Sequence, residues 1–276
     1  GDTGWKPVEV EGVQQVVRCD CWREALSGKL LDDARIPPRY RKCSFDNFVV
    51  YPNEKLQKAV VRAQAFADAF PVVEQGLFFV GPPGIGKTHL AAAVLRAVIR
   101  RCGARGIFRN TSELLKEIRG TYNPMVGPTE SGVLRPVIES ELLVLDDIGT
   151  EKTSEWVLET LNLIVNTRYN QRRPTIFTSN YEEYPESHGE SLGDKVGFRM
   201  LSRLHEMCEF LEFRGADYRY FEHSKGPPTA ADLLNMYKNQ PSRPRETGRR
   251  ASGQLKARFR ESKSDVSWPG GKAGTS

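Results

Sequence analysis

The sequence predicts an α/β fold in which a central parallel sheet is flanked by helices, with a small N-terminal module and a disordered basic C-terminal tail. In residues 51–222, short apolar runs alternate with segments of helical periodicity, which is the pattern of a parallel sheet wrapped by helices. Residues 1–50 contain a Cys-x-Cys pair and a basic segment around Pro37 and Pro38. Residues 223–276 are rich in Gly, Pro, Ser, Lys and Arg, so they lack the apolar surface that would offset their ordering entropy.

The same periodicity predicts the individual elements of the central region. Strands are expected at 77–80, 106–109, 142–145, 174–178 and 209–213. Helices are expected at 54–69, 87–101, 111–118, 133–140, 154–171 and 199–206. The third of these helices is expected to take Thr111 or Ser112 as its N-cap. A short helical contact near 230–237 is compatible with the composition of the tail.

Composition and charge exclude several classes of protein. The 276 residues are 39% hydrophobic and 27% charged, as in soluble globular proteins, and no apolar run approaches the roughly 20 residues of a membrane span. A cytoplasmic location is therefore expected, and five scattered cysteines argue against a disulfide framework. The net charge of +5 is concentrated in residues 223–276, where 11 Lys and Arg face 4 Asp and Glu, a net of +7. The remaining residues sum to about −2, so the body of the protein is not a basic nucleic-acid footprint.

A glycine-rich loop lies between an apolar strand and an apolar helix. Its residues are Gly81, Pro82, Pro83, Gly84, Ile85, Gly86, Lys87 and Thr88. A triphosphate needs many donors near its oxygens, and backbone N–H groups approach closely only where side chains are absent, as at the three glycines. Lys87 is expected to contact the β and γ phosphates, and the Thr88 hydroxyl to bind Mg²⁺. The pattern predicts binding of ATP with Mg²⁺, whereas the alternative of a chance glycine turn leaves the flanking strand and helix unexplained.

Asp146 and Asp147 follow the apolar run 142–145, at the end of another predicted strand. Asp146 is expected to bind Mg²⁺ through water, and Asp147 is expected to polarise the attacking water. In the alternative interpretation, the two carboxylates only cap the next helix. The glycine loop upstream favours the metal site, because such a site needs both parts.

Three further polar residues admit two interpretations each. Asn180 follows an apolar strand and is placed to hydrogen-bond the water or the γ phosphate, but asparagine is also a common turn residue. Arg199 and Arg203 are four residues apart and lie on one helix face. They would serve as arginine fingers toward a neighbouring subunit's phosphate, whereas spacing alone favours surface pairs with Glu206 or Glu209.

Together these stretches resemble the DnaC/DnaI/IstB group of AAA+ ATPases, which contains replicative helicase loaders and transposition helper ATPases. The resembling stretches are 81–91, 142–151, 178–180 and 199–204. The resemblance extends over residues 15–220 and implies an AAA+ P-loop ATPase core. It also implies that Lys87 and Thr88 are Walker A residues, with His89 beside the nucleotide, and that Asp146 and Asp147 form Walker B.

The resemblance implies roles for the remaining polar residues as well. Asn180 occupies the sensor 1 position, Arg203 resembles a finger that acts in trans, and Arg199 resembles an accompanying arginine. A finger in trans works only at a subunit interface, so self-association through the ATP site is expected. Residues after Tyr220 show no clear helical lid with a sensor 2 arginine, so slow or assembly-dependent turnover is expected.

Cys19 and Cys21 form the Cys-x-Cys pair of the N-terminal module. Similar proteins often carry a further Cys-x-x-Cys before the stretch that corresponds to residues 1–5. Tetrahedral Zn²⁺ takes four thiolate or imidazole ligands. Zinc is therefore expected only if further cysteines precede Gly1 in the full-length protein, and Cys43 is expected to be a small core residue.

Lys116, Arg119 and Tyr122 lie between the second and third predicted strands, where the resembled proteins insert a helix that contacts single-stranded DNA. Two cations and a stacking ring suit such binding. Without the resemblance, a solvated helix face with a buried tyrosine is the simpler interpretation. The basic tail would add a salt-dependent attraction to phosphates.

Three functions are compatible with these residues. The first is a helicase loader whose N-terminal module docks on a replicative helicase, and the second is a transposition helper ATPase. The third, a P-loop kinase for a small molecule, is least favoured because the sequence shows no substrate pocket or closing lid. The cysteine-bearing N-terminal module favours the loader, because transposition helpers commonly begin with a helical segment.

Overall fold

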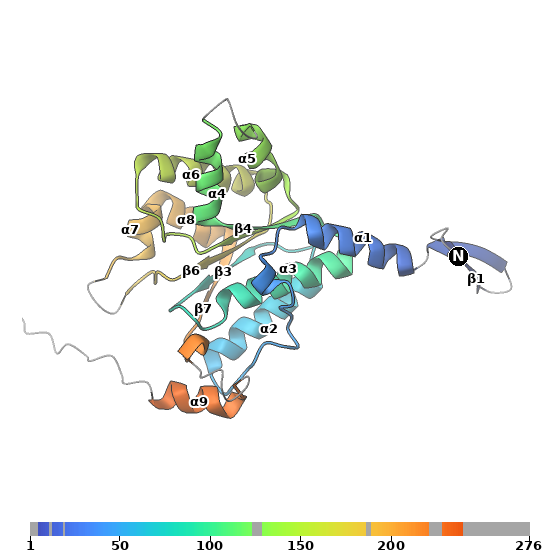
Figure 1. The fold of residues 1–276 in the computed structure, drawn as a ribbon, viewed down its shortest axis with the longest axis horizontal. Helices are drawn as coiled ribbons and strands as arrows, with labels where there is room; N and C mark the ends of the chain where they lie inside the picture. Colours follow the sequence, from blue (N-terminus) through green and yellow to red (C-terminus); the bar gives the residue numbers. More distant parts are fainter. Residues whose placement is uncertain are drawn as a thin grey trace, which may run out of the picture. The chain divides into compact units, whose positions relative to one another are not determined.

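A five-stranded parallel sheet with helices on both faces forms the centre of the computed structural model (Figure 1). The structure describes residues 5–10, 13–18, 20–122, 129–185, 189–220 and 228–239. The strands of the sheet are β3 Gly76–Val80, β4 Gly106–Asn110, β5 Leu142–Asp146, β6 Thr175–Ser179 and β7 Cys208–Glu212. Their order is β4-β5-β6-β3-β7, and every neighbouring pair is parallel. The predicted fold class is confirmed.

The predicted helices are present to within a few residues, whereas α1 and α7 were not predicted. The helices are α1 Asp20–Asp33, α2 Glu54–Ala69, α3 Lys87–Cys102, α4 Thr111–Gly120, α5 Glu130–Glu139, α6 Glu155–Asn170, α7 Leu192–Val196, α8 Phe198–Met207 and α9 Ala230–Asn239. Short 3-10 helices occupy Pro38–Tyr40 and Tyr218–Tyr220. Strands β1 Trp5–Val10 and β2 Val13–Arg18 pair as an antiparallel hairpin. None of the helices in the described ranges is long and apolar enough to cross a bilayer.

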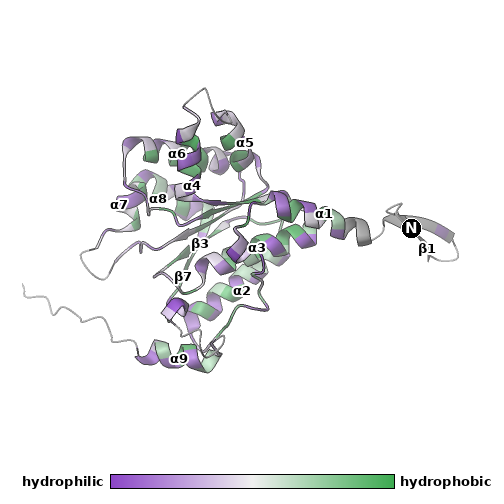
Figure 2. Ribbon diagram, viewed as in Figure 1, coloured by the Kyte–Doolittle hydropathy of each residue, from purple (hydrophilic) through white to green (hydrophobic). Residues whose placement is uncertain are grey.

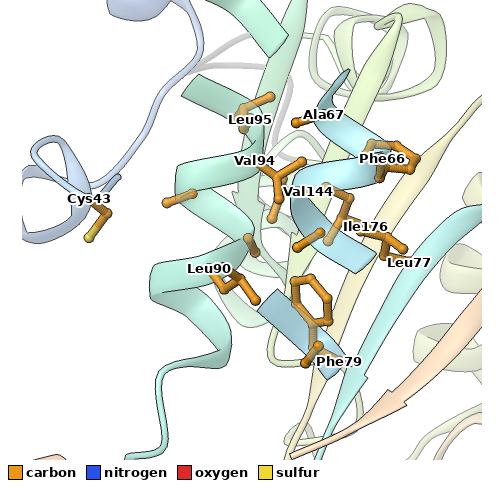
Figure 3. Close-up of a cluster of buried hydrophobic side chains, with 14 of the residues drawn as sticks. Cys43, Phe66, Ala67, Leu77, Phe79, Leu90, Val94, Leu95, Val144 and Ile176 are labelled. Carbon is orange, nitrogen blue, oxygen red and sulfur yellow. The ribbon is translucent and has the colours of Figure 1, made fainter. Parts of the chain in front are cut away.

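The two faces of the sheet are covered by separate apolar cores. On one face, Phe79 of β3 packs with Leu90 and Val94 of α3 and with residues of α2 (Figure 3). On the other face, Phe78 stacks on Phe210 at a ring distance of 4.5 Å, beneath α4, α5, α6 and α8. Successive side chains of a strand point to opposite faces, so a strand covered on both sides is apolar at every position. This explains why β3 is a continuous apolar run. The hydropathy colouring of Figure 2 shows green, hydrophobic segments in the central sheet.

The topology brings three strand ends to one place. Parallel strands present their carboxyl ends at the same edge of a sheet, and β6 lies between β5 and β3 in the strand order. The glycine loop leaves β3 at this edge, Asp146 ends β5, and Asn180 follows β6. Residues far apart in the sequence therefore meet at one edge.

The N-cap of α4 differs from the prediction. Asn110, the last residue of β4, caps the helix by accepting a hydrogen bond from the Glu113 backbone N–H at 3.2 Å. The Thr111 hydroxyl instead donates to the backbone oxygen of Asp146 at 2.8 Å. The prediction of Thr111 or Ser112 was wrong because strand and helix follow each other without a loop, so the cap falls on the last strand residue.

The predicted N-terminal module and the predicted tail each contribute residues to the core beside α2 and α3. Ala34, Ile36 and Cys43 are buried there, so the described part of the N-terminal module shares a core with the sheet. Leu233 of α9 is buried in the same cluster, although the predicted tail begins at residue 223. Helix α9 lies where the sequence allowed a short helical contact. Residues 223–227 and 240–276 lie outside the described part of the chain.

Arg168 of α6 is a fully buried cation of structural importance. Its guanidinium donates to the backbone oxygens of Val137, Ser140 and Pro174 at 2.7–3.0 Å. Burial lowers the pKa of this group. The first two acceptors lie at the carboxyl end of α5, where helix carbonyls lack intrahelical partners and favour a cation. Arg168 therefore ties α5 and β6 together.

Candidate functional site

A cavity of about 600 Å³ lies at the edge of the sheet where the three strand ends meet. Pockets that hold small molecules and cofactors are typically of this size, roughly 300–1,000 Å³. Polar side chains from the start of α3, the end of β5 and the end of β6 line it, and they include Lys87, Thr88, Asp146, Asp147, Thr178 and Asn180. Further polar lining residues are Arg39, Asn47, His89, Asn110, Glu113 and Arg219.

The loop between β3 and α3 can be built only with glycine at three positions. Gly81, Gly84 and Gly86 have φ values of +145°, +80° and +99°, in the left-handed region that L side chains rarely adopt. A Cβ atom on Gly81 would also lie 2.2 Å from the backbone oxygen of Phe213. The loop therefore runs into the N-terminus of α3 without side chains at these positions, which is the arrangement that binds phosphate groups.

Lys87 places a buried positive charge beside this loop. Its Nζ atom donates to the backbone oxygens of Gly81 and Pro82, both at 2.7 Å, and to Asn180 Oδ1 at 2.8 Å. Burial lowers the pKa of Lys87 to about 8, so the amine remains mostly protonated at neutral pH. All three acceptors are neutral groups, and the ammonium therefore retains the capacity to attract an anion.

Thr88 and Asp146 present a hydroxyl and a carboxylate side by side. Thr88 Oγ1 donates to Asp146 Oδ1 at 2.8 Å, and Thr178 Oγ1 donates to the same oxygen at 2.8 Å. Burial raises the pKa of Asp146. Oxygen donors of this kind are the ligands that Mg²⁺ prefers. A buried carboxylate that would gain from a cation, next to the Thr88 hydroxyl, fits the predicted magnesium site.

Asp147 is linked to Lys87 through Asn180. Asn180 Nδ2 donates to Asp147 Oδ1 at 2.6 Å, while Asn180 Oδ1 accepts from Lys87. The backbone N–H of Asp147 donates to Thr178 Oγ1 at 2.8 Å, which holds the residue at a left-handed φ of +63°. Burial raises the pKa of Asp147, and the charges of Lys87 and Arg219 oppose this shift. The structure thus brings Lys87, Asn180 and Asp147 into one hydrogen-bonded chain.

The segment after β7 adds residues to the site that the sequence analysis missed. Arg219, on the 3-10 helix Tyr218–Tyr220, lines the cavity and lies close enough to Asp147 to influence its charge. The Tyr218 backbone N–H donates to the Gly84 backbone oxygen at 3.0 Å. The Asp217 carboxylate lies directly against Gly84, where a Cβ atom would be 1.7 Å from its Oδ1. The sequence did contain a signal for Arg219: it is a basic residue shortly after the last parallel strand, and that strand ends at the same edge of the sheet as β3.

His89 lines the cavity, and its ring is held by the segment before α2. Its Nε2 atom lies 3.2 Å from the Ser44 backbone oxygen and 3.0 Å from Asn47 Oδ1. The ring meets Phe48 edge-on at 5.2 Å, and burial lowers the pKa of His89. Phe48 in turn lies against Gly86. His89 therefore anchors this segment next to the glycine loop.

Arg199 and Arg203 lie on α8, away from the cavity lining. Arg199 is exposed, and Arg203 is partly exposed with its guanidinium 3.4 Å from the Arg199 backbone oxygen. Neither residue lies among those that line this subunit's own cavity. Their exposure leaves them accessible to another molecule.

Arg119 and Tyr122 belong to an aromatic cluster with Trp156, at the start of α6. The Arg119 guanidinium lies 4.5 Å from the centre of the Trp156 ring, and Trp156 Nε1 donates to the Tyr122 hydroxyl at 3.0 Å. Tyr122 is 55% exposed, contrary to the alternative in which it is buried. Lys116 is exposed one turn earlier on α4. Trp156 was missed because nothing in its local sequence connects it with α4.

The zinc prediction falls outside the described side chains. Cys19 is outside the described residues, and so is the side chain of Cys21. Cys43 is buried, as expected for a core residue. Elsewhere, the part of the chain that the structure describes holds no group of three or more His, Cys, Asp or Glu side chains placed to bind a metal ion.

The fold and the cavity define a P-loop nucleotide-binding protein with the AAA+ architecture. The family model described as IstB-like ATP binding protein matches residues 38–226. The chain therefore belongs to the IstB-like ATP-binding protein family. Helix α9 lies beyond the range that the model matches.

Individual relatives agree with this assignment. The replicative helicase loader DnaC of Escherichia coli strain K12 is 30% identical over 163 residues, which are 58% of this chain and 65% of DnaC. The chain thus spans less than two thirds of that relative. The YdaV protein of the same strain is 31% identical over 63% of this chain and 69% of YdaV. A crystal structure of the DnaC helicase loader is 33% identical with a TM-score of 0.57, covering 64% of this chain and all of that one.

Proposed function

We propose that this protein binds and hydrolyses ATP with Mg²⁺ and uses the nucleotide to load a replicative helicase. The observation that carries the proposal is the hydrogen-bonded chain from Lys87 through Asn180 to Asp147, beside the Thr88 and Asp146 pair. This arrangement places the Lys87 ammonium, the Asn180 amide and the Asp147 carboxylate together in one cavity. The similarity to DnaC supports the loader function, and a cytoplasmic location is part of the proposal.

Each of these polar residues in the cavity has a distinct proposed task. Lys87 holds the phosphates by charge, Thr88 and Asp146 hold the metal, and Asp147 orients and polarises the attacking water. Bound Mg²⁺ would neutralise charge that develops on the phosphate oxygens. Asn180 keeps the Asp147 carboxylate in place, because it donates to one of its oxygens at 2.6 Å. Arg219, a further cation at the cavity, adds positive charge near Asp147.

Arg203, with Arg199 beside it, would act on the cavity of a neighbouring subunit. Both are remote from their own cavity lining and accessible on α8. A cation presented in trans stabilises the charge of phosphoryl transfer only after assembly. Turnover is therefore proposed to depend on self-association.

A transposition helper remains the second candidate, because the matching family model carries the IstB description and the ATP site is common to both functions. The N-terminal module is proposed as the docking element for the helicase. Its basic segment around Pro37 and Pro38 contains the 3-10 helix Pro38–Tyr40. A small-molecule kinase is disfavoured because the family model and the similarity to DnaC point to replication and transposition ATPases.

Co-purification with the replicative helicase of the same host tests the loader function. Wild-type protein is expected to retain the helicase on a column in the presence of ATP and Mg²⁺, and Lys87→Ala is expected to lose the part of the retention that depends on ATP. Binding to the host's helicase should be measured beside binding to a transposase encoded next to the gene. Retention of the transposase alone would contradict the loader and favour the helper.

The cluster of Arg119, Tyr122 and Trp156 is proposed to contact single-stranded DNA, with Lys116 adding charge. The exposed Tyr122 ring, and the Arg119 guanidinium over the partly exposed Trp156 ring, suit the stacking and phosphate contacts of such sites. The Tyr122 hydroxyl accepts from Trp156, so the two rings are held as one platform at 6.4 Å between centres.

Replacement of Trp156 by Ala is expected to weaken single-stranded DNA binding about tenfold, because loss of one stacked base costs on the order of 1–3 kcal/mol. Arg119→Ala should weaken binding and also lower its salt dependence, since it removes a phosphate contact. Fluorescence anisotropy with a labelled oligonucleotide measures both effects. Tyr184→Ala, at an exposed tyrosine elsewhere, is the matched control and should leave binding unchanged. Equal isotherms for wild type, Trp156→Ala and Arg119→Ala would refute the platform.

A further inference from the structure

Thr178 of β6 contacts three consecutive residues at the end of β5. Its hydroxyl donates to Asp146 Oδ1 at 2.8 Å and accepts from the Asp147 backbone N–H at 2.8 Å. Its backbone oxygen accepts from the Ile148 backbone N–H at 2.8 Å. Thr178 is fully buried, so water does not compete for these bonds. One side chain therefore holds the proposed metal ligand and the residue proposed to polarise water.

The place of Thr178 follows from the pairing of the two strands. The last residues paired between β5 and β6 are Leu145 and Phe177, so Asp146 and Thr178 come directly after this pair. The chain then leaves the direction of β5 at Asp147, whose φ is +63°. A hydroxyl both donates and accepts, so it can hold a carboxylate and a backbone N–H of this turn together. Valine has nearly the same shape as threonine but forms neither bond.

The direction of the two hydroxyl bonds is fixed by their chemistry. A backbone N–H only donates, so the Thr178 oxygen accepts from Asp147 and the hydroxyl proton is left for Asp146. Thr88 Oγ1 also donates to Asp146 Oδ1, at 2.8 Å. A carboxylate oxygen has two lone pairs, and these two bonds use both lone pairs of Oδ1. Oδ2 is therefore the oxygen of Asp146 that is left for a metal ion or its water.

The two hydroxyls that bond Asp146 differ in what Mg²⁺ would do to them. The Thr88 hydroxyl is itself a proposed metal ligand, so it would give up its bond to Asp146 when the metal binds. The Thr178 hydroxyl is not a proposed ligand, and the Asp147 N–H keeps its oxygen in place. Thr178 is therefore the donor that stays on Asp146.

We propose that Thr178 is a positioning residue for both acids: it keeps Asp146 oriented with Oδ2 free for the metal, and it keeps Asp147 in its left-handed conformation. The proposal rests on the proposed binding and hydrolysis of ATP with Mg²⁺ at this site, and it adds the residue that joins the two carboxylates. Removal of a group that orients a metal ligand typically lowers metal affinity or activity about 10- to 100-fold.

The test compares Thr178→Val, which removes both hydroxyl bonds, with Thr178→Ser, which keeps the hydroxyl. Calorimetry measures ATP affinity in EDTA and in saturating Mg²⁺, and the ratio of the two affinities is the gain from the metal. Thr178→Val is expected to reduce this gain about tenfold and to leave the affinity in EDTA within about twofold of the wild type. Turnover at saturating ATP and Mg²⁺ should fall about 10- to 100-fold, and Thr178→Ser should restore both quantities to within about threefold.

Thr175→Val is the matched control, because Thr175 is equally buried at the other end of β6. Its hydroxyl accepts from Arg168 Nε at 2.8 Å and contacts neither acid in the described structure. This variant is expected to lower the melting temperature and to keep the wild-type gain from Mg²⁺ and the wild-type turnover. Thermal unfolding of each variant checks the fold, and Thr178→Ala replaces Thr178→Val if the valine variant does not fold.

Three results would overturn the positioning role while ATP binding by the site stands. They are a wild-type gain from Mg²⁺ in Thr178→Val, an equal loss in Thr178→Ser, and an equal loss in Thr175→Val, which would assign the effect to stability alone. If the wild type does not bind ATP, or gains no affinity from Mg²⁺, the proposed site fails first and the role of Thr178 fails with it.

Discussion

Replacement of Lys87 by Ala is expected to weaken binding of ATP with Mg²⁺ by at least about 100-fold, which corresponds to roughly 3 kcal/mol from charge-assisted hydrogen bonds. The ammonium is the buried cation next to the glycine loop, and its pKa of about 8 keeps it charged at neutral pH. Alanine also leaves the backbone oxygens of Gly81 and Pro82 without their donor. Isothermal titration calorimetry at neutral pH measures the loss.

Lys58→Ala is the control for this prediction, because Lys58 is an exposed lysine on α2. It should bind ATP as the wild type does. Thermal unfolding of both variants checks that the fold is retained, so that lost affinity is assigned to the site. Wild-type affinity in Lys87→Ala would remove the basis of the proposed function, because the glycine loop would then not bind the triphosphate through its lysine.

Replacement of Asp147 by Asn is expected to lower ATP turnover by about 100- to 1,000-fold while ATP affinity changes by less than about threefold, as for loss of a general base. Asparagine has nearly the same shape and tolerates the left-handed backbone of this position at φ +63°. Its amide oxygen still accepts from Asn180, so the local structure is retained. Only the negative charge that is proposed to polarise water is lost. Phosphate release and equilibrium binding, measured on the same preparation, separate the two effects.

Arg203→Ala provides a contrast to this variant. It should leave the ATP affinity of a single subunit nearly intact and reduce only the turnover that rises with protein concentration. Turnover of Asp147→Asn equal to that of the wild type would show that another group activates the water. A loss of ATP affinity in Arg203→Ala equal to its loss of turnover would count against action in trans.

Much of the site was predictable because its main residues follow strands. The glycine loop, Asp146 and Asn180 each come directly after an apolar run, and parallel strands end at the same edge of a sheet. The predicted proximity of these residues is confirmed by the hydrogen bonds of Lys87 with Asn180 and of Thr88 with Asp146. Their roles in catalysis stay predictions.

Arg219 and Trp156 were missed for a common reason. Arg219 lies in a short 3-10 helix, Tyr218–Tyr220, which is too short to show a periodic pattern in the sequence. Trp156 begins an ordinary amphipathic helix, and only its contact with Arg119 of α4 gives it a surface role. In both cases the informative neighbour is distant in sequence.

The amino-acid sequence by itself determined the order of strands and helices, the glycine loop and the acid pair, because these depend on local periodicity and on the few residue types that a phosphate loop accepts. Only the tertiary structure decided which cations line the cavity, which arginine is buried and that Leu233 of the predicted tail joins the core. Arg219, Arg168 and Leu233 acquire their places from contacts with residues far along the chain. Such contacts are set by packing across the whole fold, and no short stretch of sequence encodes them.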